Sequence, residues 1–122
     1  GLSLEYFNNI VHTLGLPDID LFASSTLHQL PSYCSWKPDP NAFQVDAFTI
    51  PWGEHFFYAF PPFFLISRVI QKIINDEATG IVVAPVWPNQ AWFPLINALA
   101  VSKMLYVGPA DDINFSASSS TP

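Results

Sequence analysis

Hydrophobic residues recur at helical spacing near the start of the chain. Ser3 stands where a helix N-cap is expected, and Gly15 stands where that helix would stop. The apolar positions between them, spaced three or four residues apart, are Leu4, Phe7, Ile10, Val11 and Leu14. This pattern predicts an amphipathic helix over residues 4–14, followed after Pro17 by a short buried strand at Ile19–Ala23.

Strand and helix patterns alternate through the second half of the chain. Aromatic and β-branched runs predict strands, and apolar residues at helical spacing predict the helices between them. Pro61 and Pro62 stop the first of these strands, and Asn89 is the expected cap of the last helix. The predicted strands are His55–Phe60, Ile81–Val86 and Met104–Val107, and the predicted helices cover residues 64–76 and 89–99.

This alternation predicts an α/β domain with a small, mostly parallel sheet flanked by helices. The domain is expected to span residues 1–112, and the Ser-rich end, 113–122, is expected to be a disordered tail. Residues 24–51, interrupted by prolines, are expected to be a long loop that carries function or a partner surface. Because ligands gather outside the carboxyl ends of parallel strands, three segments become candidates for a site. They are Ala23–Ser25, Phe60–Phe63 and Pro85–Gln90.

The composition excludes several function classes. The 122 residues include 10 acidic and 4 basic side chains, and the net charge of −6 opposes non-specific binding of nucleic acid, which we expect only through partners. Only 11% of the residues are charged, so part of the surface is expected to meet another domain or subunit. The single cysteine does not indicate a secreted scaffold, and no apolar run is long enough for a membrane span. We therefore expect an intracellular protein, nuclear or cytoplasmic, without a membrane partner.

Few side chains stand out as chemical candidates. Cys34 has no nearby histidine and is expected to be a packed thiol, and the three histidines lack metal-ligand spacing, so no metal site is expected. Dinucleotide, P-loop and nucleophile-elbow motifs do not occur. Asp18 and Asp20 share one face of a predicted strand, where solvation at the strand end is the simpler interpretation. Asp46 either caps a turn or accepts hydrogen bonds from a ligand.

Two prolines directly after a strand make the segment from Phe60 to Phe63 a more specific signal. They fix the backbone at the carboxyl end of the strand, where an aromatic ring can stack on a planar base. A polar residue before the prolines would bind the exocyclic amine of such a base, but Phe60 offers no hydrogen bond. A rigid turn that supports the core is therefore the competing interpretation.

Several ordered blocks resemble the pol polyprotein of DIRS-type (tyrosine-recombinase) retrotransposons, in the segment after the reverse transcriptase and RNase H regions. The resemblance spans about residues 4 to 100. The catalytic motifs of those two upstream regions do not occur here. The blocks are Asp18–Ser24, Gln29–Tyr33, Ser35–Pro40, Val45–Phe48, Phe57–Phe63, Arg68–Ile73 and Ala78–Pro88.

The same blocks are similar, more distantly, to phage-type DNA N6-adenine methyltransferases (Dam-like enzymes). This second resemblance implies a small Rossmann-like, methyltransferase-like sheet. It would place Asp20, Ala23 and Asp46 at the S-adenosylmethionine site. It would also place Phe60, Pro61, Pro62 and Phe63 at the catalytic motif, facing a flipped adenine. In that motif an Asn or Asp accepts a hydrogen bond from the adenine amine, and Phe60 cannot do so.

Three functions are compatible with these observations. The first is a catalytically degenerate methyltransferase-like domain, which serves as a structural or interaction module beside other domains or subunits of a retroelement or host complex and needs no cofactor. The second is an active S-adenosylmethionine-dependent adenine methyltransferase that uses another acceptor, for which Asn89 and Gln90 are the nearest amides. The third is a binder of a nucleotide or small molecule without turnover.

Overall fold

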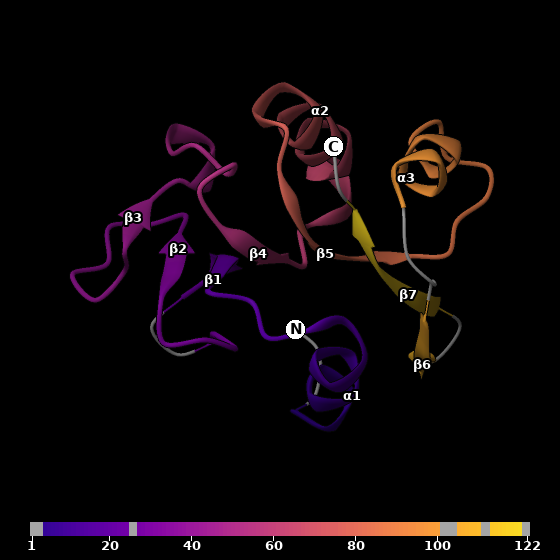
Figure 1. Cartoon of the computed structure of the whole chain (residues 1–122), viewed down its shortest axis with the longest axis horizontal. Coiled ribbons are helices and arrows are strands. Elements are labelled where there is room, and N and C mark those ends of the chain that lie inside the picture. Colours follow the sequence, from indigo (N-terminus) through magenta and orange to yellow (C-terminus); the bar gives the residue numbers. More distant parts are fainter. Residues whose placement is uncertain (1–3, 25–26, 101–104, 111–112, 121–122) are drawn as a thin grey trace.

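A seven-stranded mixed sheet forms the centre of the molecule (Figure 1). The computed structural model describes residues 4–24, 27–100, 105–110 and 113–120, the last two ranges as backbone strands. The strand order is β3-β2-β1-β4-β5-β7-β6. The strands are β1 (Ile19–Ala23), β2 (Tyr33–Ser35), β3 (Gln44–Val45), β4 (Phe56–Ala59), β5 (Thr79–Pro85), β6 (Leu105–Ala110) and β7 (Ile113–Ser120).

The first five strands are parallel, and β7 runs antiparallel to both of its neighbours, β5 and β6. The chain therefore has the small Rossmann-like, mostly parallel α/β fold that the sequence predicts. From β1 the order extends through β2 and β3 on one side and through β4 and β5 on the other. This reversal places a topological switch point between β1 and β4, where ligands of open α/β sheets bind.

Three α-helices cover the two faces of the sheet. Figure 1 shows α1 (Leu4–Leu14) on one face and both α2 (Ile66–Asp76) and α3 (Phe93–Leu99) on the other. The side chains of β4 alternate between these layers: Phe57 and Ala59 join the core beneath α2, whereas Tyr58 joins the core beneath α1. None of the helices in the described part of the chain is long and apolar enough to cross a membrane.

The residues on either side of helix α2 determine where it begins and ends. Pro62 leads into the 3-10 turn Phe63–Leu65, which feeds α2 directly. The helix ends at Glu77, which adopts a left-handed conformation with φ 51° and donates its N–H to Ile73 and Ile74. Four apolar residues of α2 are buried against the sheet, in agreement with the predicted amphipathic pattern: Ile66, Val69, Ile70 and Ile73.

Most predicted elements are confirmed within a few residues, but three strands differ from the expectation. β2 and β3 lie inside the segment expected to be one long loop, where they are held by backbone pairing with β1 and with each other. Residues 113–120 form β7 beside β5, whereas a disordered tail was expected at 113–122. A strand ladder is made by backbone groups, so a Ser-rich segment can pair with a hydrophobic strand. The predicted cap Ser3 and the strand start at Met104 lie outside the described residues.

Candidate functional site

A cavity of about 530 Å³ lies beside the carboxyl ends of β1 and β4, at the switch point of the sheet. Its volume is in the range of small-molecule sites. β1 and the residues after it contribute Asp20, Phe22, Ala23 and Ser24, and β4 and the residues after it contribute Tyr58, Phe60, Pro61 and Pro62. The segment before β2 adds Leu27, His28 and Gln29, and Trp36 follows β2. The cavity thus brings together five of the predicted site residues: Asp20, Ala23, Phe60, Pro61 and Pro62.

Asp20 supplies a buried carboxyl group to this cavity. The residue is 3% exposed, and its Oδ2 accepts a hydrogen bond from the Gln29 backbone N–H at 2.8 Å. Burial raises the pKa of Asp20 to about 6, although the backbone N–H groups of Gln29 and Phe22 act in the opposite direction. The interpretation of Asp20 as a solvated strand-end residue is therefore wrong. Its carboxyl group changes charge close to neutral pH.

Tyr58 lies directly across from Asp20 in the pairing of β1 with β4. Its ring packs edge-on against Phe7 of α1, with the two centroids 4.9 Å apart. The Tyr58 hydroxyl group is buried and has no hydrogen-bond partner among the described residues. Burial, and then the charge of Asp20, raise the pKa of this phenol, so Tyr58 is neutral at any physiological pH.

An irregularity in β1 shapes the aromatic wall of the cavity. The register between β1 and β2 shifts between Asp20 and Ala23, which is typical of a β-bulge. Phe22 packs against Trp36, with centroids 5.8 Å apart, and its ring also meets Phe48 and Trp52 on the α2 side. Trp36 remains 44% exposed. The wall therefore combines a fixed ring with a partly solvent-exposed indole.

The segment after β4 occupies the cavity only in part. Phe60, Pro61 and Pro62 line it, and the partly buried Phe60 also packs against the core beneath α1. Phe63 does not line the cavity: it is 61% exposed, and its ring contacts Trp87 at a centroid distance of 5.7 Å. The prolines thus agree with both the ligand-binding and the rigid-turn interpretation, because they form a rigid turn and also line one wall of the cavity.

Asp46 does not line the cavity and fulfils the alternative role expected for it, as a turn cap. The residue has φ 66°, and its Oδ1 accepts a hydrogen bond from the Phe48 backbone N–H at 3.0 Å. Its own N–H donates to the Ser35 carbonyl oxygen. Of the two carboxylates expected to hold a cofactor, therefore, only Asp20 belongs to the cavity.

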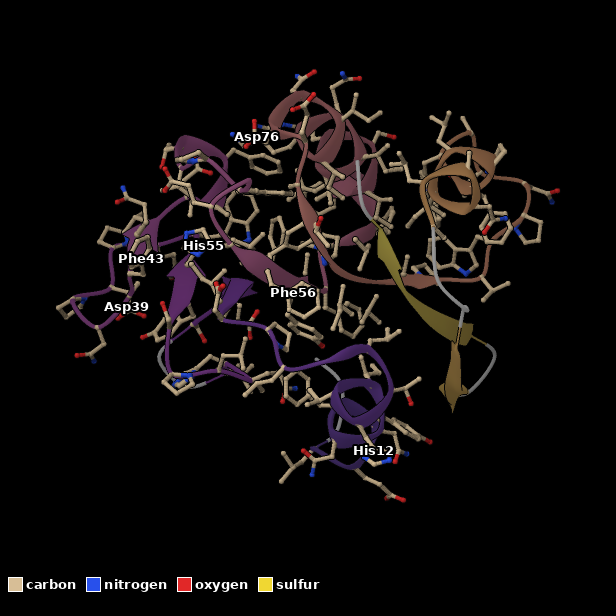
Figure 2. The ribbon with its side chains drawn as sticks, in the orientation of Figure 1. His12, Asp39, Phe43, His55, Phe56 and Asp76 are labelled. Carbon is tan, nitrogen blue, oxygen red and sulfur yellow. The ribbon has the colours of Figure 1, made fainter. Side chains whose placement is uncertain are left out.

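The other acid of the first strand, Asp18, lies outside the cavity as well. It precedes β1 and binds the imidazole before β4 and the first backbone N–H of β4: Oδ1 is 2.8 Å from His55 Nδ1, and Oδ2 accepts the Phe56 N–H at 2.9 Å. The Phe43 and His55 rings pack at nearly right angles with centroids 5.9 Å apart, and Figure 2 labels these two side chains beside each other. The bonds of Asp18 to His55 and Phe56 join the amino ends of β1 and β4, at the opposite end of these strands from the cavity.

Cys34 and the histidines offer no second reactive site. Cys34 is fully buried, and burial followed by the charges of Asp20 and Asp46 raises the pKa of its thiol to about 11. A thiol with so high a pKa is a poor nucleophile. Among the described residues, no group of three or more histidine, cysteine or acidic side chains is arranged to hold a metal ion. Asn89 and Gln90 are exposed and do not line the cavity.

Sequence reasoning missed Tyr58, His28 and Gln29 as cavity residues. A signal was present for Tyr58, because it carries the one polar group in the run Phe56–Ala59, and a buried hydroxyl group needs a partner. Gln29 acts through its backbone N–H, which side-chain identity does not reveal. Comparison with protein-family models and with curated proteins finds no match for this chain.

Proposed function

We propose that this chain is a methyltransferase-like domain, derived from a retroelement polyprotein of the DIRS type, that no longer transfers a methyl group and serves as a binding and interaction module. The resemblance of its sequence blocks supports the origin. The cavity supports a binding role, because it lies at the switch point of a Rossmann-like sheet. The antiparallel β7 between β5 and β6 also distinguishes this sheet from the all-parallel order of dinucleotide-binding domains.

One observation carries the loss of catalysis: Phe60 lines the cavity where a polar acceptor would be needed. Adenine-N6 transfer requires a group that accepts a hydrogen bond from the amine and holds its lone pair toward the methyl donor. Deleting one preorganised polar group of this kind costs about 3 kcal/mol of transition-state stabilisation. The amides of Asn89 and Gln90 do not compensate, because neither residue lines the cavity.

The incomplete fit of the cavity to S-adenosylmethionine also supports a loss of catalysis. The cavity has the volume for a nucleoside-sized ligand, and Asp20 and Ala23 line it, but Asp46 instead caps the turn at Phe48. Half of the acidic pair expected for S-adenosylmethionine is therefore missing from the site.

The surface supports a role in assembly. Leu27, Phe63 and Phe64 are 74%, 61% and 70% exposed, respectively, although each is a large hydrophobic residue. Exposed aromatic side chains and sparse charge are typical of surfaces that contact another protein domain. The partners we propose are neighbouring domains or subunits of a retroelement or host complex, through which any contact with nucleic acid would be made.

A second candidate, a small-molecule binder without turnover, is favoured by the polar groups inside the cavity. Asp20 and Tyr58 are paired residues of β1 and β4 that both line the cavity, and the Tyr58 hydroxyl group has no hydrogen-bond partner among the described residues. Buried polar groups without partners are unfavourable unless a ligand satisfies them. This candidate is compatible with an assembly role, since one module can hold both a ligand and a partner.

The decisive experiment measures methyl transfer from labelled S-adenosylmethionine to adenine-containing DNA, with an active adenine methyltransferase as the positive control. We expect no transfer by the natural chain. Phe60→Asn restores the missing acceptor, and Phe63→Asn is the matched control outside the cavity. Methyl transfer by the natural chain above the background without protein would refute the proposal.

A further inference from the structure

We propose that the cavity binds an organic cation through an alkylammonium group, with the Asp20 carboxylate as its counter-ion and the Tyr58 hydroxyl oxygen as a second acceptor. This inference rests on the proposed binding role and adds a chemical class of ligand to it. The two groups come from neighbouring strands, where Asp20 and Tyr58 are directly paired.

Tyr58 and Asp20 both have hydrogen-bonding capacity that the described residues leave unused. Tyr58 Oη has no partner among the described residues, and both Asp20 and Tyr58 are at most 3% exposed. The Asp20 carboxylate accepts from Gln29 at 2.8 Å, yet an ionised carboxylate offers about four lone-pair positions. An ammonium group has several N–H donors and no acceptor, so it can donate to Asp20 and to Tyr58 Oη at the same time.

The charge of Asp20 is not balanced by a lysine or arginine in the lining. Among the residues that the structure describes, none of either type lines the cavity: Arg68 lies over the Phe48 ring, and Lys72 is bonded to Asp76. His28 is the one basic side chain in the lining, and it is held by the Leu30 carbonyl oxygen at 2.6 Å and stacked on Tyr33. A buried carboxylate without a full cationic partner is unfavourable, and a bound cation removes that penalty.

The walls of the cavity are mostly aromatic and apolar. Phe22, Trp36, Tyr58 and Phe60 line the same cavity as Asp20, and Pro61 and Pro62 add apolar surface. Aromatic faces attract ammonium groups, and apolar surface accommodates alkyl carbons. An anionic ligand such as a phosphate would find no lysine or arginine among the described lining residues and would be repelled by the Asp20 carboxylate. The net charge of −6 adds a long-range attraction for cations.

The charge state of Asp20 makes this binding dependent on pH. The titratable groups that face Asp20 are Tyr58 from β4, Tyr33 and Cys34 from β2, and His28 from the segment before β2. Tyr33, Cys34 and Tyr58 all have raised pKa values, so they stay neutral near pH 7. Binding of a cation should therefore strengthen as the pH rises through about 6, where Asp20 ionises.

The test is calorimetric titration of the full chain with n-butylammonium, with neutral butan-1-ol as the isosteric control. We expect saturable binding of the amine, at least about tenfold tighter than binding of the alcohol. Asp20→Asn should weaken amine binding by at least about tenfold and Tyr58→Phe by about threefold. Asp46→Asn is the matched control, since Asp46 does not line the cavity, and it should leave amine binding unchanged.

Three results would overturn the inference: equal binding of amine and alcohol, no effect of Asp20→Asn, or no strengthening with pH. If Asp20→Asn fails to fold, Tyr58→Phe and the pH series still decide. Adenosine is titrated in parallel. Binding of adenosine with no binding of the amine refutes the cation and leaves the proposed binding role intact. Methyl transfer to DNA, by contrast, refutes the proposed function whatever the amine does.

Discussion

Tyr58 places a hydroxyl group in the core beneath α1, where the described residues give it no hydrogen-bond partner. An unsatisfied buried donor costs about 1–3 kcal/mol relative to a partnered one. A natural sequence retains such a group where function needs it, because proteins give up stability at their binding sites. At the scale of single residues, we therefore expect the Tyr58 hydroxyl group to lower the free energy of unfolding of the ligand-free chain.

Tyr58→Phe tests this expectation, because it removes the unpartnered hydroxyl group and keeps the ring that packs on Phe7. The free energy of unfolding should rise by about 1 kcal/mol in the absence of ligand. Urea denaturation measures it, with Tyr33→Phe as the control, since the Tyr33 hydroxyl donates to Asp39 at 3.0 Å and its removal should destabilise. A loss of stability in Tyr58→Phe would show that the hydroxyl group has a partner after all.

Asp20 carries the second residue-scale prediction, a pH dependence of stability. Its folded-state pKa, about 6, lies above the usual 3.8, so the folded chain favours the protonated form. The contribution of Asp20 to stability is therefore greatest below about pH 4 and falls by on the order of 3 kcal/mol as the pH rises through 6. The Asp20→Asn variant has no titratable group at this position and therefore lacks this pH-dependent change in stability. The difference between the natural chain and Asp20→Asn, measured by urea unfolding from about pH 4 to pH 8, should shift in favour of the variant. A constant difference would refute the raised pKa.

Helix α2 is fastened to the segment before β4 by one carboxylate. Asp76, in the last turn of α2, accepts the Trp52 backbone N–H at 2.8 Å and bonds Lys72 at the same distance. Trp52 is fully buried and donates its indole N–H to the Ala47 carbonyl oxygen. Desolvation raises the pKa of Asp76, but the bonds from Lys72 and Trp52 outweigh it, and the pKa is lowered overall. Asp76 thus acts as a clamp that holds Trp52 in place, and the Trp52 ring packs against Phe22 in the wall of the cavity.

Asp76→Ala leaves the Trp52 N–H without its acceptor and should destabilise the chain by about 2 kcal/mol. Gln71→Ala is the matched control on the same helix, because its bond to Asn75 is exposed and should contribute little. Thermal unfolding compares the two. Since the pKa of Asp76 is lowered, its stabilisation should be present at neutral pH and be lost on acidification below the usual pKa of an aspartate. Equal stability of both variants would contradict the clamp.

The elements with many apolar residues were predictable, and those built from backbone pairing were not. The periodicity of α1 and α2 and the β-branched run of β5 each indicate their element directly. β2 and β3 have three and two residues, too few to show a period, and their pairing with distant strands leaves no local signal. The cavity follows the same division. The prolines were predictable from the end of β4, and Asp20 was expected only from the resemblance to adenine methyltransferases. The contacts of Gln29 and Tyr58 depend on tertiary pairing.

At the scale of the whole molecule, β7 joins the parallel strands to β6. It pairs with β5 from Gly80 to Pro85 and with β6 on its other side. Removing residues 113–122 should therefore leave the edge of β5 unpaired and destabilise the sheet. Hydrogen exchange of the β5 amides measures this directly. We expect faster exchange at Ile81–Ala84 in the truncated chain, whereas a tail without structure would leave their protection unchanged.

The position of β7 also sets an order of events during synthesis. Domains fold as the chain leaves the ribosome, and the strands from β1 to β5 emerge well before Ile113–Ser120. Until that last segment arrives, β5 presents an open hydrophobic edge, and α1 lacks the strands β6 and β7 beside which it lies. The nascent domain is therefore exposed to pairing with another chain for longer than a sheet that grows outward in order. A chaperone that covers the edge of β5 until β7 has emerged should therefore favour correct folding of this domain.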